Sequence, residues 1–249
     1  MHYTAMLNCQ NFFDTYKQGF LDKTVKVVEI GSQDVNGSLR VCCPSEFEYV
    51  GVDFIAAKGV DIILEDPYKL PFESASVDIV LTSSCFEHSE MFWLAFLDTL
   101  RILKPHGLLY MNVPSNGEFH RYPVDCWRFY PDSGNALLTW AKRNGMNPAL
   151  LESYTSEQNW DVWNDFVAIF VKDGNEAARY PDRILTDRVD LSNGVTLGSK
   201  NFINYQFLPE DRRKLQYISE LFNTELAAMD DLEKLDLIKQ IVNNEVKLR

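Results

Sequence analysis

The segment from Val25 to Asp53 constrains the fold of this chain more than any other. A β-branched, apolar run at residues 26–30 stops at Gly31, and a second run at residues 49–52 ends in Asp53. A strand, a tight turn, a short helix and a second strand in this order open a nucleotide-binding α/β domain. In such domains the ligand lies at the carboxyl ends of the strands, where an acid that ends the second strand accepts hydrogen bonds from ribose hydroxyls.

The turn after the first strand argues against a dinucleotide. Residues 31–38 lack the G-x-G-x-x-G spacing that brings the backbone close to a pyrophosphate. The acids Glu29 and Asp34 flank this turn and would repel phosphate groups. We therefore expect a cationic ligand that carries a ribose, with Glu29 and Asp53 among the residues that bind it.

Composition excludes several classes of protein. The 24 basic and 36 acidic residues give a net charge of −12, which argues against a general affinity for nucleic acid or anionic membranes. No apolar run approaches the roughly 18 residues that a bilayer span needs, and the first residues do not have the pattern of a signal peptide. We expect a cytoplasmic protein without a membrane span. The five cysteines include no C-x-x-C pair, so neither a disulfide framework nor a zinc site is predicted from them.

The chain to residue 173 alternates between predicted strands and helices. Further strands are expected at residues 59–65, 77–81, 108–113, 149–154 and 166–171, and helices within 1–20 and at 91–102 and 135–144. Such alternation indicates a mostly parallel sheet with right-handed crossovers. The link 155–165 is too short for a crossover, so the last two strands should pair antiparallel. The expected fold is a Rossmann-like, mostly parallel, seven-stranded sheet that ends in an antiparallel hairpin.

The remaining residues form a second predicted region. Residues 174–206 have no strand pattern and are expected to be an irregular arm, whereas 209–247 carry a helical pattern. We therefore divide the chain into a domain at 1–173 and an extension at 174–249. The extension is expected to cap the domain or to form a homo-oligomer.

Five short motifs together resemble one family. In chain order they are Val28-Glu29-Ile30-Gly31, Gly51-Val52-Asp53, Asp66 with Leu70-Pro71-Phe72, residues 76–80 with Phe86-Glu87-His88, and residues 103–109. Their order and spacing resemble the class I S-adenosylmethionine-dependent methyltransferases, in the subgroup whose compact domain acts on small molecules and glycans. Two departures are the missing second glycine of the first motif and His106 where a glycine is common.

The resemblance implies S-adenosylmethionine as the cofactor and assigns residues to its parts. The implied cofactor-binding residues are Glu29, Gly31 and Ser32 for the methionine end, Asp53 and Phe54 for the ribose, Asp66 and Pro67 for the adenine, and Ser83 and Ser84 beside the sulfonium. The acidic first turn agrees with this cofactor because a sulfonium carries a positive charge.

The stretch 114–132 follows the fifth strand and is unusually rich in functional side chains. It should lie over the carboxyl edge of the sheet, where an acceptor must approach the methyl group. Transfer to a hydroxyl needs a base, and His120 is the first candidate because imidazole accepts protons near neutral pH. Asp125 is expected to orient His120 or to be the base itself, and His88 is the second candidate base. Each histidine has an alternative role in hydrogen bonds that order the local backbone.

Substrate-binding residues are predicted in and near the same stretch. They are Arg121 and Arg128 for a phosphate or carboxylate, Trp127, Phe129 and Tyr130 for a sugar or aromatic group, Tyr122 in the same loop, and Trp160, Trp163 and Asn164 at the same edge of the sheet. The alternative is that the arginines form ion pairs within the loop and that the aromatic rings form its core. Histidine, aspartate and asparagine side chains near the site are of types that could also bind a divalent metal, but no ligand spacing demands one and none is predicted.

The leading hypothesis is a methyltransferase that acts at oxygen on a sugar, a glycan precursor or another small polar metabolite. One alternative is methylation of nitrogen or carbon in a small molecule. Another is a catalytically inactive, methyltransferase-like binding or scaffold protein. An NAD-dependent dehydrogenase is disfavoured by the glycine spacing and the acidic turn.

Overall fold

The protein is described from a computed structural model, which covers residues 2–20, 24–158, 162–224 and 229–243. The helices are α1 (Tyr3–Tyr16), α2 (Phe92–Ile102), α3 (Ser133–Arg143), α4 (Glu210–Thr224) and α5 (Asp231–Val242). The strands are β1 (Lys26–Ile30), β2 (Glu48–Asp53), β3 (Ile62–Ile63), β4 (Val77–Ser83), β5 (Leu103–Pro114), β6 (Ala149–Ser156), β7 (Asp165–Val171) and β8 (Leu191–Thr196). The parts of the predicted helical extension at 225–228 and 244–247 lie outside the described residues.

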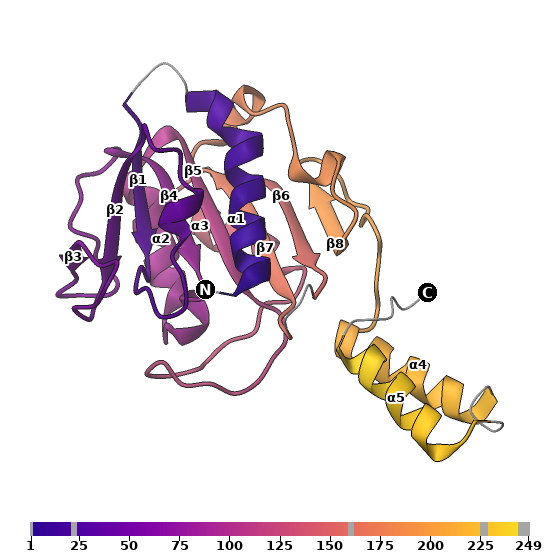
Figure 1. The fold of residues 1–249 in the computed structure, drawn as a ribbon. Coiled ribbons are helices and arrows are strands. Elements are labelled where there is room, and N and C mark those ends of the chain that lie inside the picture. Colours follow the sequence, from indigo (N-terminus) through magenta and orange to yellow (C-terminus); the bar gives the residue numbers. More distant parts are fainter. Residues whose placement is uncertain (1, 21–23, 159–161, 225–228, 244–249) are drawn as a thin grey trace.

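One sheet in the order β3-β2-β1-β4-β5-β7-β6-β8 organises the molecule (Figure 1). The first five strands in this order pair in parallel, and β7, β6 and β8 pair antiparallel. The predicted Rossmann-like α/β sheet with a C-terminal antiparallel hairpin is therefore confirmed. Its carboxyl edge brings together the ends of β1, β2, β4 and β5.

The predicted strand number was wrong by one. Strand β8 lies within the expected irregular arm and pairs with the edge of β6, where Thr155 faces Ser192 and Ser156 faces Leu191. Its sequence, LSNGVT, has little apolar character, so the pairing depends on the free edge of β6 rather than on a local pattern. The predicted strand at 59–65 is shorter than expected, because only Ile62 and Ile63 pair with β2.

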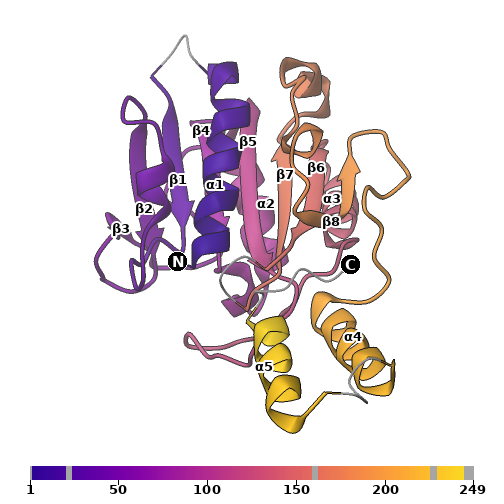
Figure 2. The same ribbon diagram turned by 45° about the vertical axis from the view of Figure 1, so that its right-hand side comes forward.

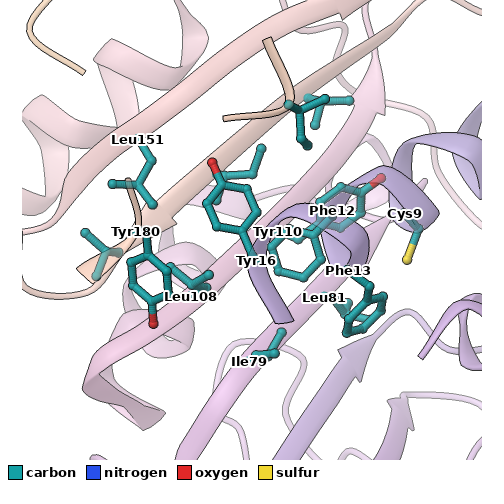
Figure 3. Close-up of a cluster of buried hydrophobic side chains, with 14 of the residues drawn as sticks. Cys9, Phe12, Phe13, Tyr16, Ile79, Leu81, Leu108, Tyr110, Leu151 and Tyr180 are labelled. Carbon is teal, nitrogen blue, oxygen red and sulfur yellow. The ribbon is translucent and has the colours of Figure 1, made fainter. Parts of the chain in front are cut away.

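The helix predicted within residues 1–20 is rich in aromatic side chains and covers one face of the sheet. Phe12, Phe13 and Tyr16 of α1 are buried and pack over Leu81 and Tyr110 of the central strands (Figure 3). The ring centroids of Phe12 and Tyr110 are 5.0 Å apart. Burial of several such rings is a large hydrophobic contribution to stability.

The other face is covered by α2 and α3. Phe96, Leu100 and Leu137 pack there against side chains of β5 and β7, which include Leu109 and Phe170. Because both faces are covered, the central strands are mostly apolar, and the ligand site is left to the edge of the sheet.

The helical pair α4 and α5 lies beyond the carboxyl ends of the parallel strands (Figure 2). Ile241 of α5 packs against Tyr217 and Ile218 of α4. Short 3-10 helices between β7 and β8 contribute Tyr180, Ile184 and other side chains to the α1 face of the core. The division of the chain at 173 and 174 stays a prediction, although the sheet itself continues to Thr196.

Candidate active site

A pocket of about 610 Å³ lies at the carboxyl ends of β1, β2 and β4. Six of the predicted cofactor residues line it, namely Gly31, Asp53, Phe54, Pro67, Ser83 and Ser84. The pocket therefore lies where the open α/β sheet predicts a ligand. Its far side is lined by residues of the 114–132 stretch and by Trp163.

Asp53 ends β2 with a buried side chain that lines the pocket. Its Oδ1 accepts a hydrogen bond of 3.2 Å from the backbone N–H of Ile55, which orients the carboxylate. Burial raises the pKa of Asp53, against the opposing effect of backbone hydrogen bonds. A ribose hydroxyl that donates to this carboxylate would relieve part of the cost of burying it.

Glu29 is buried on β1 behind the Gly31 turn and does not line the pocket. The hydroxyl of Tyr49 donates a hydrogen bond of 2.6 Å to its Oε2. Burial raises the pKa of Glu29 to about 7 despite this bond. The carboxyl group of Glu29 therefore lies beneath the turn at Gly31 and outside the pocket.

Ser32 is also buried and does not line the pocket. A Cβ on Gly51 would lie 2.6 Å from Ser32 Oγ and 2.3 Å from the carbonyl oxygen of Gly59. Only a glycine at position 51 allows the turn to pack this closely on β2. Ser32 thus packs closely on Gly51 of β2, beneath the turn.

Asp66 is exposed and lies off the pocket, next to Pro67, which lines it. Its Oδ1 accepts a hydrogen bond of 2.8 Å from the backbone N–H of Tyr68, as expected for an acid in a turn. The predicted role with adenine has no support from this arrangement and stays a prediction.

The stretch 114–132 is fixed over the edge of the sheet by backbone hydrogen bonds. The N–H groups of Cys126 and Trp127 donate to the carbonyl oxygen of Glu87 at 2.7 and 3.2 Å. The N–H of Phe129 donates to the carbonyl oxygen of Pro114 at 2.9 Å. These bonds place the predicted catalytic loop beside the end of β4.

His88 and His120 meet in the pocket, with ring centroids 4.9 Å apart. Nδ1 of His88 lies 2.6 Å from the carbonyl oxygen of Val124, and Nδ1 of His120 lies 3.1 Å from that of Glu118. Since a carbonyl only accepts, each Nδ1 carries the proton and each Nε2 keeps its lone pair. Burial lowers the pKa of His88, which favours the neutral imidazole.

Asp125 holds the loop rather than lining the pocket. Its carboxylate accepts from Arg128 Nη1 at 2.6 Å and Nη2 at 2.9 Å, and from the backbone N–H of His120 at 2.7 Å. The Arg128 guanidinium lowers the pKa of Asp125 to about 2. Of the two predicted roles, these contacts favour orientation of His120 over proton acceptance.

Some of the predicted substrate-binding residues line the pocket and others do not. Tyr122 and Trp163 line the pocket, and the Trp163 ring lies 5.0 Å from that of His120. Arg121, Trp127, Arg128 and Asn164 do not line it. Trp127 Nε1 donates to the carbonyl oxygen of Ser89. Trp160 lies outside the described residues.

Asn164 connects the edge of the sheet to the helical extension. Its Nδ2 donates to the carbonyl oxygen of Ser156 and to Oε2 of Glu210, the first residue of α4. Beside it, Asn116 Nδ2 donates to Asp211 Oδ2 at 3.0 Å. The extension is thus attached next to the acceptor side of the pocket.

Sequence reasoning missed several residues that line the pocket, among them His2, Glu87 and Asp165. His2 Nε2 lies 2.7 Å from Asp165 Oδ2, which also accepts from Asn112 Nδ2 at 3.0 Å. Burial raises the pKa of Glu87 to about 8. Glu87 lies in one of the quoted motifs, which was the available signal, whereas nothing local connects residue 2 with residue 165.

Comparisons with known proteins agree with this geometry. Residues 39–111 match the family described as "Methyltransferase domain". No curated protein matches the chain. The chain therefore contains a methyltransferase domain. This confirms the predicted enzyme class and, with it, S-adenosylmethionine as the cofactor.

Two solved structures share the fold, each with a TM-score of 0.50 and 13% sequence identity. One is 1,6-didemethyltoxoflavin-N1-methyltransferase of Burkholderia thailandensis, where the match covers 68% of this chain and 78% of that one. The other is the YcgJ protein of Bacillus subtilis, where it covers 69% of this chain and 99% of that one. At this identity the similarity concerns the fold of the methyltransferase.

The described part of this methyltransferase contains no helix that is both long and apolar enough to cross a bilayer. The cytoplasmic location stays a prediction.

Proposed function

We propose that this methyltransferase transfers the methyl group of S-adenosylmethionine to a hydroxyl oxygen of a sugar, a glycan precursor or another small polar metabolite. The observation that carries the proposal is the pair of histidines, His88 and His120, on the pocket wall. Both have an Nε2 lone pair, and a hydroxyl acceptor has a proton to lose. Tyr122 and Trp163 on the same wall provide flat apolar surfaces of the kind that pack against sugar rings.

In this proposal the cofactor occupies the half of the pocket lined by Gly31, Asp53, Phe54 and Ser83. The acceptor occupies the half lined by His88, His120 and Trp163. Methyl transfer is an in-line displacement, so the acceptor oxygen, the methyl carbon and the sulfur must be aligned. A pocket with the two halves facing each other across the end of β4 supports such an alignment.

The first test is calorimetric titration of the full chain with S-adenosylhomocysteine. We expect a dissociation constant in the micromolar range, which lies within the range of affinities that enzymes commonly have for their substrates. Asp53→Ala should lose this binding, and the exposed, off-pocket variant Glu65→Gln is the matched control. Failure of the intact chain to bind would contradict the assignment of the cofactor half and favour a binding or scaffold protein.

The acceptor is tested by supplying a methyl-labelled donor with panels of sugars and nucleotide sugars. Label in an ether linkage, identified by product analysis, would support methylation at oxygen. Label on nitrogen or carbon would overturn the acceptor class while leaving the methyltransferase assignment intact.

The extension of residues 174–249 stays a prediction as a homo-oligomer interface. Its attachment through Glu210 and Asp211 to Asn164 and Asn116 supports a role beside the acceptor half. Analytical ultracentrifugation of the full chain would decide between a monomer and an oligomer.

A further inference from the structure

Three side chains on the acceptor side of the pocket form a cluster of metal-ligand types. They are Glu87, His88 and His120, and one ligand atom from each lies within 4.8 Å of the others. Glu87 and His88 follow β4 in a short 3-10 helix, whereas His120 comes from the stretch after β5. Two segments about thirty residues apart in sequence thus meet at one point.

Glu87 is the feature that points to a cation. Its side chain is 1% exposed, and its Oε2 has no hydrogen-bond partner within the described part of the protein. Burying a carboxylate without partners costs free energy, so such groups in native proteins are normally paired or bind a metal. The nearest side-chain nitrogen is Nε2 of His88, at 3.7 Å from Oε1, which is beyond hydrogen-bond distance.

The charge of the nearby Arg128 opposes the rise in the pKa of Glu87, but within the described part of the protein Arg128 forms its ion pair with Asp125 and not with Glu87. Both terminal nitrogens of Arg128 donate to Asp125, and Nη2 also donates to the carbonyl oxygen of Glu118. The guanidinium charge is therefore balanced by Asp125, and the Glu87 carboxylate is left for another positive group.

The two histidines are oriented as metal ligands usually are. A ligating imidazole commonly donates its second N–H to a carbonyl or carboxylate, which fixes the tautomer and the ring. His88 does so to Val124, and His120 does so to Glu118, with Asp125 Oδ2 3.6 Å from the same Nδ1. Both Nε2 atoms are thereby available for coordination.

We propose that Glu87, His88 and His120 bind one divalent transition-metal cation of the Zn²⁺ type, with an open coordination position toward the pocket. Two imidazoles and one carboxylate form a ligand set that suits Zn²⁺ better than Mg²⁺. Ligand atoms about 2.1 Å from a tetrahedral zinc lie roughly 3.4 Å apart, so ligand atoms that now lie within 4.8 Å of one another must approach by up to about 1.4 Å. The side chain of His120 is 40% exposed, which leaves it room to rotate inward.

This site deepens the proposed function and rests on it for its catalytic consequence. A hydroxyl oxygen of the acceptor would take the open position, and the cation would lower its pKa so that its proton passes to bulk water. The oxygen lone pair then forms the bond to the methyl carbon. The carbon–sulfur bond breaks with its electrons going to sulfur, which leaves a neutral thioether. With their Nε2 lone pairs bound to the cation, His88 and His120 would act on this proton only through the metal, in place of the direct proton acceptance that the metal-free site allows.

The test uses the full chain after treatment with a chelator. Calorimetric titration with Zn²⁺ and absorption titration with Co²⁺ should each show one equivalent bound. Glu87→Gln and His120→Ala should each weaken Zn²⁺ binding by about a hundredfold or more, since loss of even an outer partner of a ligand costs about ten- to a hundredfold. The matched controls are His106→Ala and Glu90→Gln, which should bind as the unaltered chain does.

Binding of S-adenosylhomocysteine is measured on every variant as a readout of folding and of the proposed function. If Glu87→Gln fails to bind it because the variant does not fold, the loop variant His120→Ala alone decides. The metal site is overturned if the intact chain takes up no Zn²⁺, or if His120→Ala binds it as tightly as the intact chain. If the intact chain takes up Zn²⁺ but does not bind S-adenosylhomocysteine, the proposed function is overturned and the metal site is not.

Discussion

The two halves of the pocket are built in different ways. The cofactor half comes mainly from one continuous segment, in which the Gly31 turn follows β1 and Asp53 ends β2. The acceptor half combines His2, Glu87, His120 and Trp163, which lie on separate segments. The first half therefore depends on local backbone geometry, whereas the second depends on packing between distant segments. We therefore expect substitutions in one half of the pocket to leave the function of the other half nearly unchanged.

The largest expected effect is on the cofactor half. Asp53→Ala removes the carboxylate at the end of β2, and hydrogen bonds to a charged group contribute about 1.5–3 kcal/mol each. We expect the dissociation constant for S-adenosylhomocysteine to rise by a hundredfold or more, measured by calorimetry. The unfolding temperature should change little, and an unchanged dissociation constant would show that the cofactor does not contact Asp53.

The second effect is confined to the acceptor half. His120→Ala should lower turnover by roughly a hundredfold, the usual range for loss of a residue in proton transfer, and leave cofactor affinity nearly unchanged. Steady-state kinetics with the identified acceptor and calorimetry with S-adenosylhomocysteine measure the two quantities. Full turnover in this variant would remove His120 from the mechanism.

A smaller effect is expected from the packing of the acceptor loop. Gly117 has a φ of +108°, and a Cβ there would lie 1.9 Å from the Trp163 ring. Gly117→Ala should displace Trp163 and raise the KM for the acceptor about tenfold, in line with a strain of about 1–3 kcal/mol. Gly145→Ala is the matched control, because Gly145 has a φ of +77° and no atom within 4 Å of a built Cβ. Equal KM values in the two variants would contradict a role for the Trp163 contact.

The smallest effect is a pH dependence in the cofactor half. The pKa of Glu29 rises on folding from 4.5 to about 7 because the carboxyl group is buried. Between these values the folded state holds more of the proton than the unfolded state, so the stability that Glu29 contributes falls as pH rises. Relative to Glu29→Gln, the free energy of unfolding should fall by about 1 kcal/mol per pH unit in this window. Urea unfolding of both proteins at several pH values measures the difference, and parallel pH profiles would contradict it.

Much of the sheet could be predicted because its buried parallel strands are mostly apolar. Valine, isoleucine and leucine make up most of residues 26–30 and 77–81. Strand β8 could not be predicted, since its polar sequence forms a strand only against the edge of β6. The register between Thr155 and Ser192 is a tertiary property with no local signature.

The site was predictable to the extent that its residues lie at strand ends. Gly31, Asp53 and Ser83 line the pocket for this reason, and their roles toward the cofactor stay predictions. Asp66 was expected to bind the adenine, and Asp125 to orient His120 or to be the base. Both carboxylates accept hydrogen bonds from their own segments, which for Asp125 favours the orienting role. An acid in a turn and an acid in a site have the same local sequence pattern, so only the surrounding contacts distinguish them.

The sequence by itself determined the order of strands and helices, the class of the fold and the cofactor end of the pocket. Each of these depends on apolar periodicity, on a glycine turn or on an acid at the end of a strand. Such features are set by residues that are near neighbours in the sequence. Only the tertiary structure decided that β8 joins the sheet, and that Glu87 meets His88 and His120 in one cluster. Such contacts join segments that are far apart in the chain, and they form only when packing of the whole core brings those segments together.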